Sequence, residues 1–290
     1  MNVSLIVNPS AGNKAHRSIH EIESLLSRDA VLKTFVTRKR GDAFEYAKNN
    51  CDSDRIIVSG GDGTFNEVLN GLLSSENISL AGIPLALIPT GTANVLAKEL
   101  KIPEDIKKAT ELALTGTARK IALGRINGRY FILMAGIGFD GETVLSVRRN
   151  LLKQISGKAA YIAAGLKVLM KYDPSLIKIK TPACELTGYT VVIGNAVNYG
   201  GYFSVTPHVS ITEPLLDVCV LKSRSRRDLL RFIIGVLRRK HLSFDDVSYF
   251  KTTEAEIVSD GTVHVQTDGD YFGTLPVRID VVRDAVSIVY

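Results

Sequence analysis

The chain has 290 residues, of which 45% are hydrophobic and 23% are charged, as in an ordinary folded globular protein. Its formal net charge of +6 is too small to indicate a nucleic-acid-binding protein and favours an anionic ligand or an anionic membrane surface. The three cysteines are far apart, which argues against a disulfide framework and for a reducing compartment. No segment approaches the roughly 20 apolar residues that span a bilayer. We expect a soluble, cytoplasmic protein that associates with membranes only peripherally.

The first 124 residues alternate predicted strands with predicted helices. Apolar, strand-like runs occupy residues 3–8, 31–37, 55–61 and 84–92, and helical patterns with one apolar face lie between them. Strand–helix units in series predict an α/β domain, with a parallel sheet covered by helices on both faces. Ligands of such a sheet bind at the carboxyl ends of its strands.

Residues 125–290 show a different pattern. Short β-like runs with turns between them are interrupted by two helical stretches, at about 141–171 and 224–241. Many short strands of this kind predict a second domain that is a mainly antiparallel β-sandwich. We leave open that the last strand returns to the first domain.

A glycine-rich turn follows the third predicted strand, in the segment SGGDGTFNEVLNGL that begins at Ser59. Its glycines permit a tight turn and let backbone N–H groups approach an anion. Thr64 and Glu67 match a capping box, which predicts that the next helix starts at Thr64, with a helix N-terminus that favours negative charge. Asp62 would repel a phosphate in this turn. A plain strand-to-helix connection is the alternative interpretation.

Two further turns follow other predicted strands of the same sheet. NPSAGNK, at residues 8–14, comes after the first strand, and IPTGTAN, at 88–94, contains the end of the fourth. The second turn offers hydroxyl, backbone and amide groups. Any one of these turns could be a plain loop. Three of them on one sheet would meet at one edge, which predicts a nucleotide site.

The motifs NPSAGNK, GGDGTFNEVLNGL, PTGTAN, AGIGFD and TDGD occur in the order found in the diacylglycerol kinase catalytic-domain family. From Asn8 to Asp270 the chain resembles the YegS- and BmrU-like lipid kinases of that family. The resemblance implies an ATP-binding domain like those of NAD kinases and phosphofructokinases, and a β-sandwich domain for the lipid substrate. It implies Mg²⁺-dependent transfer of the γ-phosphoryl group of ATP to a hydroxyl of diacylglycerol or a related lipid at the membrane surface. It leaves a homodimer open.

The resemblance also assigns site residues. It implies an ATP site made of Asn8, Pro9, Ser10, Ala11, Gly12, Thr37, Gly60, Gly61, Asp62, Gly63, Thr64, Phe65, Asn66, Glu67, Thr90, Gly91, Thr92 and Asn94. Asp62 would act through Mg²⁺, which bridges its carboxylate to the phosphates and turns repulsion into attraction. The implied catalytic residues are Asp62, Asp140, Asp268 and Asp270.

Three positions depart from the family pattern, and one of them is Val95, which follows Asn94 where the family commonly has aspartate. Asp270 stands where the family commonly has a glutamate that takes the substrate hydroxyl proton, and aspartate can perform the same chemistry. Glu213 precedes a proline where the family commonly has Asp-Gly. The implied metal ligands are Asp62 and Asp268, together with Glu213 and the carbonyl groups of Ser210 and Leu215.

Alternatives remain for several of these features. Asp268 and Gly269 are also typical of an ordinary hairpin turn. The basic stretch 222–241 is either a membrane-surface helix or a packed helix with a solvated basic face. An NAD kinase-like enzyme and a non-catalytic lipid- or nucleotide-binding regulator are the alternative functions.

Overall fold

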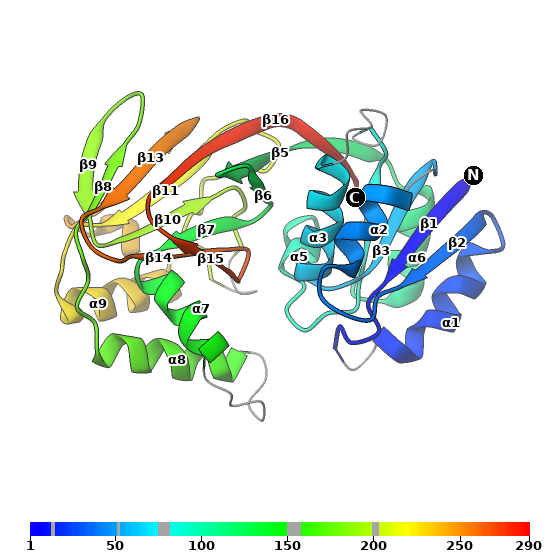
Figure 1. Cartoon of the computed structure of the whole chain (residues 1–290), viewed down its shortest axis with the longest axis horizontal. Coiled ribbons are helices and arrows are strands. Elements are labelled where there is room, and N and C mark those ends of the chain that lie inside the picture. The colour runs from blue at the N-terminus through cyan, green and yellow to red at the C-terminus, as the bar shows by residue number, and fades with distance from the viewer. Residues whose placement is uncertain (13–14, 51–52, 75–81, 150–157, 199–202) are drawn as a thin grey trace. The chain divides into compact units, whose positions relative to one another are not determined.

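The computed structural model describes residues 1–12, 15–50, 53–74, 82–149, 158–198 and 203–290, and its contacts divide the chain into two units. Unit 1 comprises Met1–Ala122 and Arg283–Tyr290, and unit 2 comprises Leu123–Val282. Two long strands, β5 (Ala118–Ile126) and β16 (Val277–Val289), contribute residues to both units (Figure 1). Each unit has a hydrophobic core of its own.

Unit 1 is built on a parallel sheet. Its strands are β1 (Asn2–Val7), β2 (Val31–Val36), β3 (Arg55–Gly60) and β4 (Leu85–Pro89). They lie in the order β2-β1-β3-β4, and the end of β16 pairs in parallel with β4. β1, β3 and β4 are buried almost throughout, which explains why these strands are continuous apolar runs in the sequence. The predicted parallel sheet is confirmed.

The helices of unit 1 lie on both faces of this sheet. They are α1 (Ala15–Leu26), α2 (Asp42–Asn50), α3 (Asp62–Leu73), α5 (Val95–Glu99) and α6 (Ile106–Thr115). Right-handed crossovers put α1 on one face and α2 and α3 on the other, because the chain reverses its direction across the sheet after β2. Accordingly, α2 packs on α3, and α1 packs on α6 (Figure 1).

The start of α3 differs from the prediction. The helix begins at Asp62 with Gly61 as its N-cap residue, and no side chain caps it. Thr64 and Glu67 therefore lie inside the helix, and the predicted capping box is wrong. Thr64 accepts a hydrogen bond from the Asn8 side chain, and Glu67 accepts one from the backbone of Gly41. Both side chains are used in contacts with distant parts of unit 1.

Unit 2 is a sandwich of two antiparallel sheets. One has the order β12-β11-β10-β7-β14-β15, and the other contains β9, β8, β13 and the first part of β16. Its strands are β6 (Arg129–Phe131), β7 (Met134–Ile137), β8 (Ile177–Lys180), β9 (Glu185–Gly188), β10 (Thr190–Gly194), β11 (Leu216–Leu221), β12 (Val247–Thr252), β13 (Glu254–Ser259), β14 (His264–Thr267) and β15 (Asp270–Thr274). One core cluster contains Ile193 of β10 and Ile257 of β13, one from each sheet. The predicted β-sandwich is confirmed.

Three helices and one short 3-10 turn complete the described part of unit 2. They are α7 (Phe139–Arg149), α8 (Lys158–Met170), α9 (Arg226–Leu237) and η1 (His241–Ser243). The predicted helical stretch 141–171 corresponds to α7 and α8, and residues 150–157 between them lie outside the described residues. Within the described ranges, no helix combines the length and apolar character that crossing a bilayer requires.

Candidate functional site

The three glycine-containing turns of unit 1 lie together at the carboxyl ends of β1, β3 and β4. The Asn8 N–H donates to the Ser59 carbonyl oxygen over 2.9 Å, which joins the first turn to the end of β3. A Cβ atom on Gly12 would lie 2.8 Å from the Thr90 carbonyl oxygen, and one on Gly91 would lie 2.5 Å from the Gly61 Cα. Such close approaches leave no room for side chains. The glycines therefore bring the backbones of the three turns into contact.

Asp62 holds two of these turns together. Its two carboxylate oxygens accept hydrogen bonds from the Val95 N–H, over 3.0 Å, and from the Leu96 N–H, over 2.9 Å. These are the first amides of α5, which have no partner inside their own helix. The carboxylate at the start of α3 thus also caps α5. A negative charge is stabilised by both helix N-termini.

Two buried oxygen atoms of the turn that follows β4 test whether this edge suits a cation. The Thr90 Oγ1 and the Asn94 Oδ1 make no hydrogen bond within the described part of the chain. Buried oxygens without partners are costly, so they indicate a ligand. Each Asp62 oxygen keeps a second lone pair beyond its backbone hydrogen bond. Hydroxyl, amide and carboxylate oxygens are the ligands that Mg²⁺ accepts beside phosphates, so these residues fit the ion.

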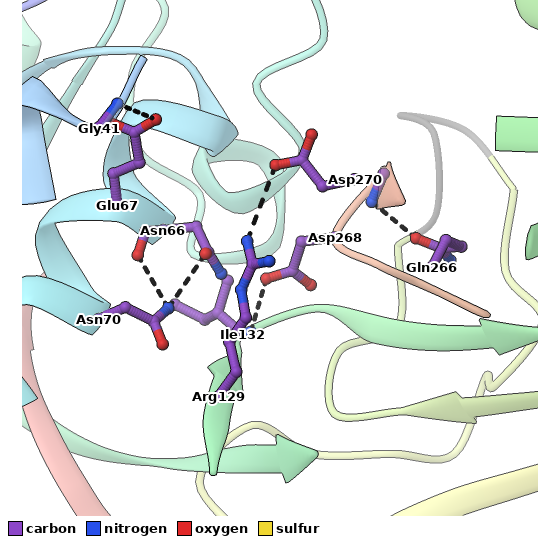
Figure 2. Close-up of polar contacts among 10 residues, drawn as sticks. Gly41, Asn66, Glu67, Asn70, Arg129, Ile132, Gln266, Asp268 and Asp270 are labelled. Carbon is purple, nitrogen blue, oxygen red and sulfur yellow. Dashed lines mark hydrogen bonds and ion pairs between the residues drawn. The ribbon is translucent and has the colours of Figure 1, made fainter. Parts of the chain in front are cut away.

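Several other residues of the predicted ATP site are buried or hydrogen-bonded within unit 1. Thr37 is buried after β2, and its N–H donates to the Val7 carbonyl oxygen, next to Asn8. Phe65 is fully buried in the core, so only its backbone can face a ligand. Figure 2 shows that Asn66 accepts from Asn70 and that Glu67 accepts from Gly41.

The remaining predicted ATP-site residues lie in or beside the three turns, with Gly60 at the end of β3 and Gly63 in the first turn of α3. They are Pro9, Ser10, Ala11, Gly60, Gly63 and Thr92. The N–H of Ser10 donates to the Asn8 side chain, and the Ala11 N–H donates to the Asn8 carbonyl oxygen. Asn8 therefore shapes the first turn. Residues 13 and 14, at the end of the NPSAGNK motif, lie outside the described residues.

In unit 2, the predicted catalytic residue Asp268 anchors a turn. Its carboxylate accepts three backbone hydrogen bonds, of 2.8 Å from Ile132, 2.9 Å from Leu133 and 3.0 Å from Met134. Figure 2 shows the bond from Ile132. Asp268 has a φ of +50° and occupies the hairpin turn between β14 and β15. The hairpin turn expected at Asp268 is present. The Asp268 carboxylate also fixes this turn to the segment that follows β6.

Asp140 supports the same turn through Gln266. Asp140, in the first turn of α7, is buried and accepts a hydrogen bond of 2.6 Å from the Gln266 Nε2. The other end of this amide, Gln266 Oε1, accepts from the Gly269 N–H over 2.8 Å (Figure 2). The fully buried Gln266 thus connects Asp140 to the backbone beside Asp268.

Asp270 lies directly after this turn, at the start of β15. Its side chain is 37% exposed, and its Oδ2 lies 3.9 Å from a guanidinium nitrogen of Arg129. Three of the predicted carboxylates, Asp140, Asp268 and Asp270, are therefore brought together around one hairpin of unit 2. A partly exposed carboxylate on a fixed turn can accept a proton from a bound hydroxyl.

At the predicted metal site, the Glu213 carboxylate is paired with a lysine. The Glu213 carboxylate lies 3.0 Å from the Lys251 Nζ, and the Ser210 carbonyl oxygen accepts the Glu213 N–H. A metal ion at this site would have to replace the ammonium group as the partner of the carboxylate, and the Ser210 carbonyl oxygen keeps a second lone pair. Leu215 is half-buried before β11. No group of three or more histidine, cysteine, aspartate or glutamate side chains placed to hold a metal occurs in the described ranges.

An apolar pocket of about 350 Å³, partly open to solvent, lies in unit 2. It is formed by α7, α8, β10 and α9, and its lining includes Phe139, Leu166, Val192 and Phe232. Asp140 also lines it, so one buried carboxylate borders an otherwise apolar space. The pocket has the shape and chemistry of a site for a hydrocarbon chain.

Helix α9 has two apolar faces. Leu229, Phe232 and Val236 are buried, in agreement with the packed-helix interpretation. Leu230, Ile234 and Leu237 are exposed. This face borders a groove that also contains Arg227, Arg238 and Lys240. The helix is therefore packed on one side and presents apolar and basic side chains on the other.

Two residues of this region were missed by sequence reasoning. Gln266 is four positions before Asp270, in the strand TVHVQ, and a glutamine in an apolar strand is the signal that could have drawn attention to it. Arg129 follows the dipeptide Asn127-Gly128, a strong hairpin signal. Its proximity to Asp270 depends on tertiary structure and has no local signal.

Comparison with known proteins agrees with this arrangement. A model described as "Diacylglycerol kinase catalytic domain" matches residues 2–126, and one described as "YegS C-terminal NAD kinase beta sandwich-like domain" matches residues 134–290. A diacylglycerol kinase of Bacillus subtilis (strain 168) is 32% identical over 281 residues, which cover 94% of this chain and 90% of that protein. A diacylglycerol kinase of Mycobacterium tuberculosis (strain ATCC 25618 / H37Rv) is 30% identical over 81% of this chain and 76% of its own.

Solved structures show the same likeness. A structure described as a diacylglycerol kinase from Bacillus anthracis str. Sterne has a TM-score of 0.75 and 25% identity, and the match covers 100% of this chain and 96% of that one. A second structure from the same organism has a TM-score of 0.81 and 26% identity with the same coverage. The chain therefore belongs to the diacylglycerol kinase catalytic-domain family and is a YegS- and BmrU-like lipid kinase.

Proposed function

We propose that this lipid kinase uses ATP and Mg²⁺ to phosphorylate a hydroxyl of diacylglycerol or a related lipid. The apolar pocket of unit 2 is the observation that carries the substrate assignment, because its volume and lining suit an acyl chain. A pocket for a polar acceptor such as NAD would need many more polar groups. The family and the lining of this pocket together favour the lipid over the nucleotide acceptor.

The nucleotide belongs to the edge of the sheet in unit 1. Gly12, Gly61 and Gly91 carry no side chain where the three turns approach one another, so backbone N–H groups can face phosphate oxygens. Asp62, Thr90 and Asn94 would hold the Mg²⁺ ion, which neutralises phosphate charge when bound. The turn needs no P-loop lysine if that positive charge comes with the metal.

In the proposed reaction, Asp270 takes the proton of the lipid hydroxyl as its oxygen bonds to the γ-phosphorus. The bond between that phosphorus and the β–γ bridging oxygen breaks, and ADP leaves with the electron pair. Asp268 and Gln266 hold the hairpin that carries Asp270, so the carboxylate is positioned before substrate arrives.

An assay with labelled ATP, Mg²⁺ and a panel of acceptors tests this proposal. The panel contains diacylglycerol, phosphatidylglycerol, a sphingoid base and NAD. We expect phosphate transfer to diacylglycerol and loss of transfer on chelation of Mg²⁺. Transfer to NAD alone, or to none of the lipids, would contradict the proposal. ATP binding without turnover would favour a regulatory protein.

A variant that fills the pocket tests the acyl-chain site. Gly165 lines the pocket, and a Cβ atom there would meet only ordinary contacts at 3.8 Å. We expect Gly165→Leu to raise the KM for diacylglycerol about tenfold, since it displaces one or two methylene contacts of about 0.8 kcal/mol each, and to leave the KM for ATP unchanged. Ala163→Leu, on the exposed side of α8, is the matched control.

We further propose peripheral membrane association through the exposed faces of α8 and α9. Met170 is 69% exposed and Ile234 is 39% exposed, and basic residues border Ile234. Apolar insertion combined with basic charge favours an anionic membrane surface. The homodimer stays a prediction.

Sedimentation with lipid vesicles tests the membrane proposal. We expect the protein to bind phosphatidylglycerol-containing vesicles more tightly than pure phosphatidylcholine vesicles. Met170→Asp with Ile234→Asp should abolish this binding. Val258→Asp, which adds a charge at an exposed position of β13, should not. Equal binding by all three proteins would contradict the proposed surface.

A further inference from the structure

Arg129 and Asp270 occupy equivalent positions of two hairpins in unit 2. Residues 127–128 join β5 to β6, and residues 268–269 join β14 to β15. All four joining residues have φ between +44° and +86°, so both loops are type I′ turns. Arg129 is the first residue after one turn, and Asp270 is the first residue after the other.

Backbone contacts fix the two hairpins to each other. Besides the three amides that donate to its carboxylate, Asp268 donates its own N–H to the Met134 carbonyl oxygen over 3.0 Å. The bonded segment, 132–134, follows β6 directly. The backbone positions of Arg129 and Asp270 relative to each other are therefore set by strands and turns, and only the Arg129 side chain is left to move.

The ion pair itself is loose. The Arg129 guanidinium lies 3.9 Å from the Asp270 carboxylate, which is beyond hydrogen-bonding distance. The neighbouring strand offers a contrast, because Arg125 makes two hydrogen bonds with Asp280, a closed bidentate pair. The Arg129 side chain is 38% exposed, so a ligand can reach it. Arg129 is held near Asp270 without being bound tightly to it.

We propose that Arg129 is a further catalytic residue, which binds an oxygen of the phosphoryl group during its transfer. This inference rests on the function proposed above. A guanidinium presents planar, fixed donors that match phosphate oxygens, and it keeps its charge throughout the reaction. The phosphoryl group carries charge on its equatorial oxygens as the new oxygen–phosphorus bond forms. Arg129 pairs with Asp270 before substrate binds, and moves to the phosphoryl oxygens as Asp270 takes the hydroxyl proton.

Steady-state kinetics with diacylglycerol, ATP and Mg²⁺ test this role. Arg129→Ala should lower kcat about 100-fold, the usual effect of removing one donor to a developing charge, with the KM for diacylglycerol unchanged. Arg129→Lys should lose less, because it keeps the charge but not the planar donors. Free guanidinium chloride at millimolar concentration should restore part of the activity of Arg129→Ala. Arg125→Ala, which removes a guanidinium from the adjacent strand, is the matched control.

The outcomes separate this inference from the proposed function. If the wild-type protein phosphorylates no lipid, the proposed function fails and the role of Arg129, which rests on it, is refuted with it. If the wild type is active and Arg129→Ala matches Arg125→Ala in kcat, the role of Arg129 is refuted. The role is also refuted if Asp270→Asn and the Asp270→Asn, Arg129→Ala double variant have equal kcat, since Arg129 would then act only through Asp270. Thermal unfolding shows whether each variant is folded.

Discussion

Replacing Asp62 by alanine should destabilise unit 1 as well as stop catalysis. The carboxylate accepts one backbone N–H on each oxygen, from Val95 and from Leu96. Hydrogen bonds to a charged acceptor contribute about 1.5–3 kcal/mol each, and the lower value suits the half-buried Asp62. The expected loss is therefore about 3 kcal/mol of unfolding free energy. Asp62→Asn should also lose stability, because its amide nitrogen would face one of the two N–H donors.

Urea unfolding and hydrogen exchange measure this effect. With an m-value of about 3 kcal/mol/M, the midpoint of Asp62→Ala should fall by about 1 M. The amides of residues 95 and 96 should exchange faster in the variant. Asp105→Ala is a control, because the Asp105 side chain caps α6 by accepting one hydrogen bond from the Lys108 N–H. Its loss should lower the unfolding free energy by about 1 kcal/mol. An inactive Asp62→Ala with wild-type stability and exchange would refute this reasoning and leave the carboxylate a purely catalytic role.

Three further predictions concern stability. Asp268→Ala should lower the unfolding free energy of unit 2 by about 3–5 kcal/mol, because three amides lose their acceptor. Chemical unfolding followed by a probe in unit 2 measures this loss, and a loss smaller than that of Asp105→Ala would contradict the prediction. Gly71→Ala should lower the unfolding free energy by about 2 kcal/mol or more, because the new Cβ would lie 2.2 Å from the Phe44 carbonyl oxygen where α3 packs on α2. An unchanged melting temperature would contradict this prediction and show that the two helices can move apart without cost. Burial lowers the pKa of His241, so the folded state binds its proton less readily than the unfolded state. Stability should therefore fall as the pH drops below about 6.5, by at most about 1.4 kcal/mol per pH unit from this group. His241→Gln should lose this component in melts compared between about pH 7 and pH 5, and an identical pH dependence would exclude His241 as its source.

The sequence predicted local features well and long-range contacts poorly. The parallel sheet could be predicted because β1, β3 and β4 are buried on both sides and remain apolar throughout. The start of α3 could not, because Asp62 is bonded to amides 33 and 34 positions away. A local pattern at Thr64 and Glu67 therefore gave a false capping box.

The same distinction holds in unit 2. Asp268 could be assigned to a turn from its own dipeptide, since Asp-Gly favours type I′ hairpins. Its role as an acceptor depends on residues 132–134, at separations of 134 to 136 positions. The bond between Asp140 and Gln266 spans 126 positions. No local periodicity reports such contacts, so they could come only from the folded structure or from likeness to a family.

The path of β16 has a consequence for how the protein is made. The other parallel strands of unit 1, β1 to β4, come from residues up to Pro89, but β4 receives its second neighbour only from the end of β16, where Ile288 lies opposite Leu85. A ribosome delivers these residues after all of unit 2 has been synthesised. Until then, β4 is an apolar strand with an open edge, which invites pairing with other chains. A product that ends just before Arg283 would contain all of unit 2. It would still expose the open edge of β4 in unit 1 to proteases and chaperones.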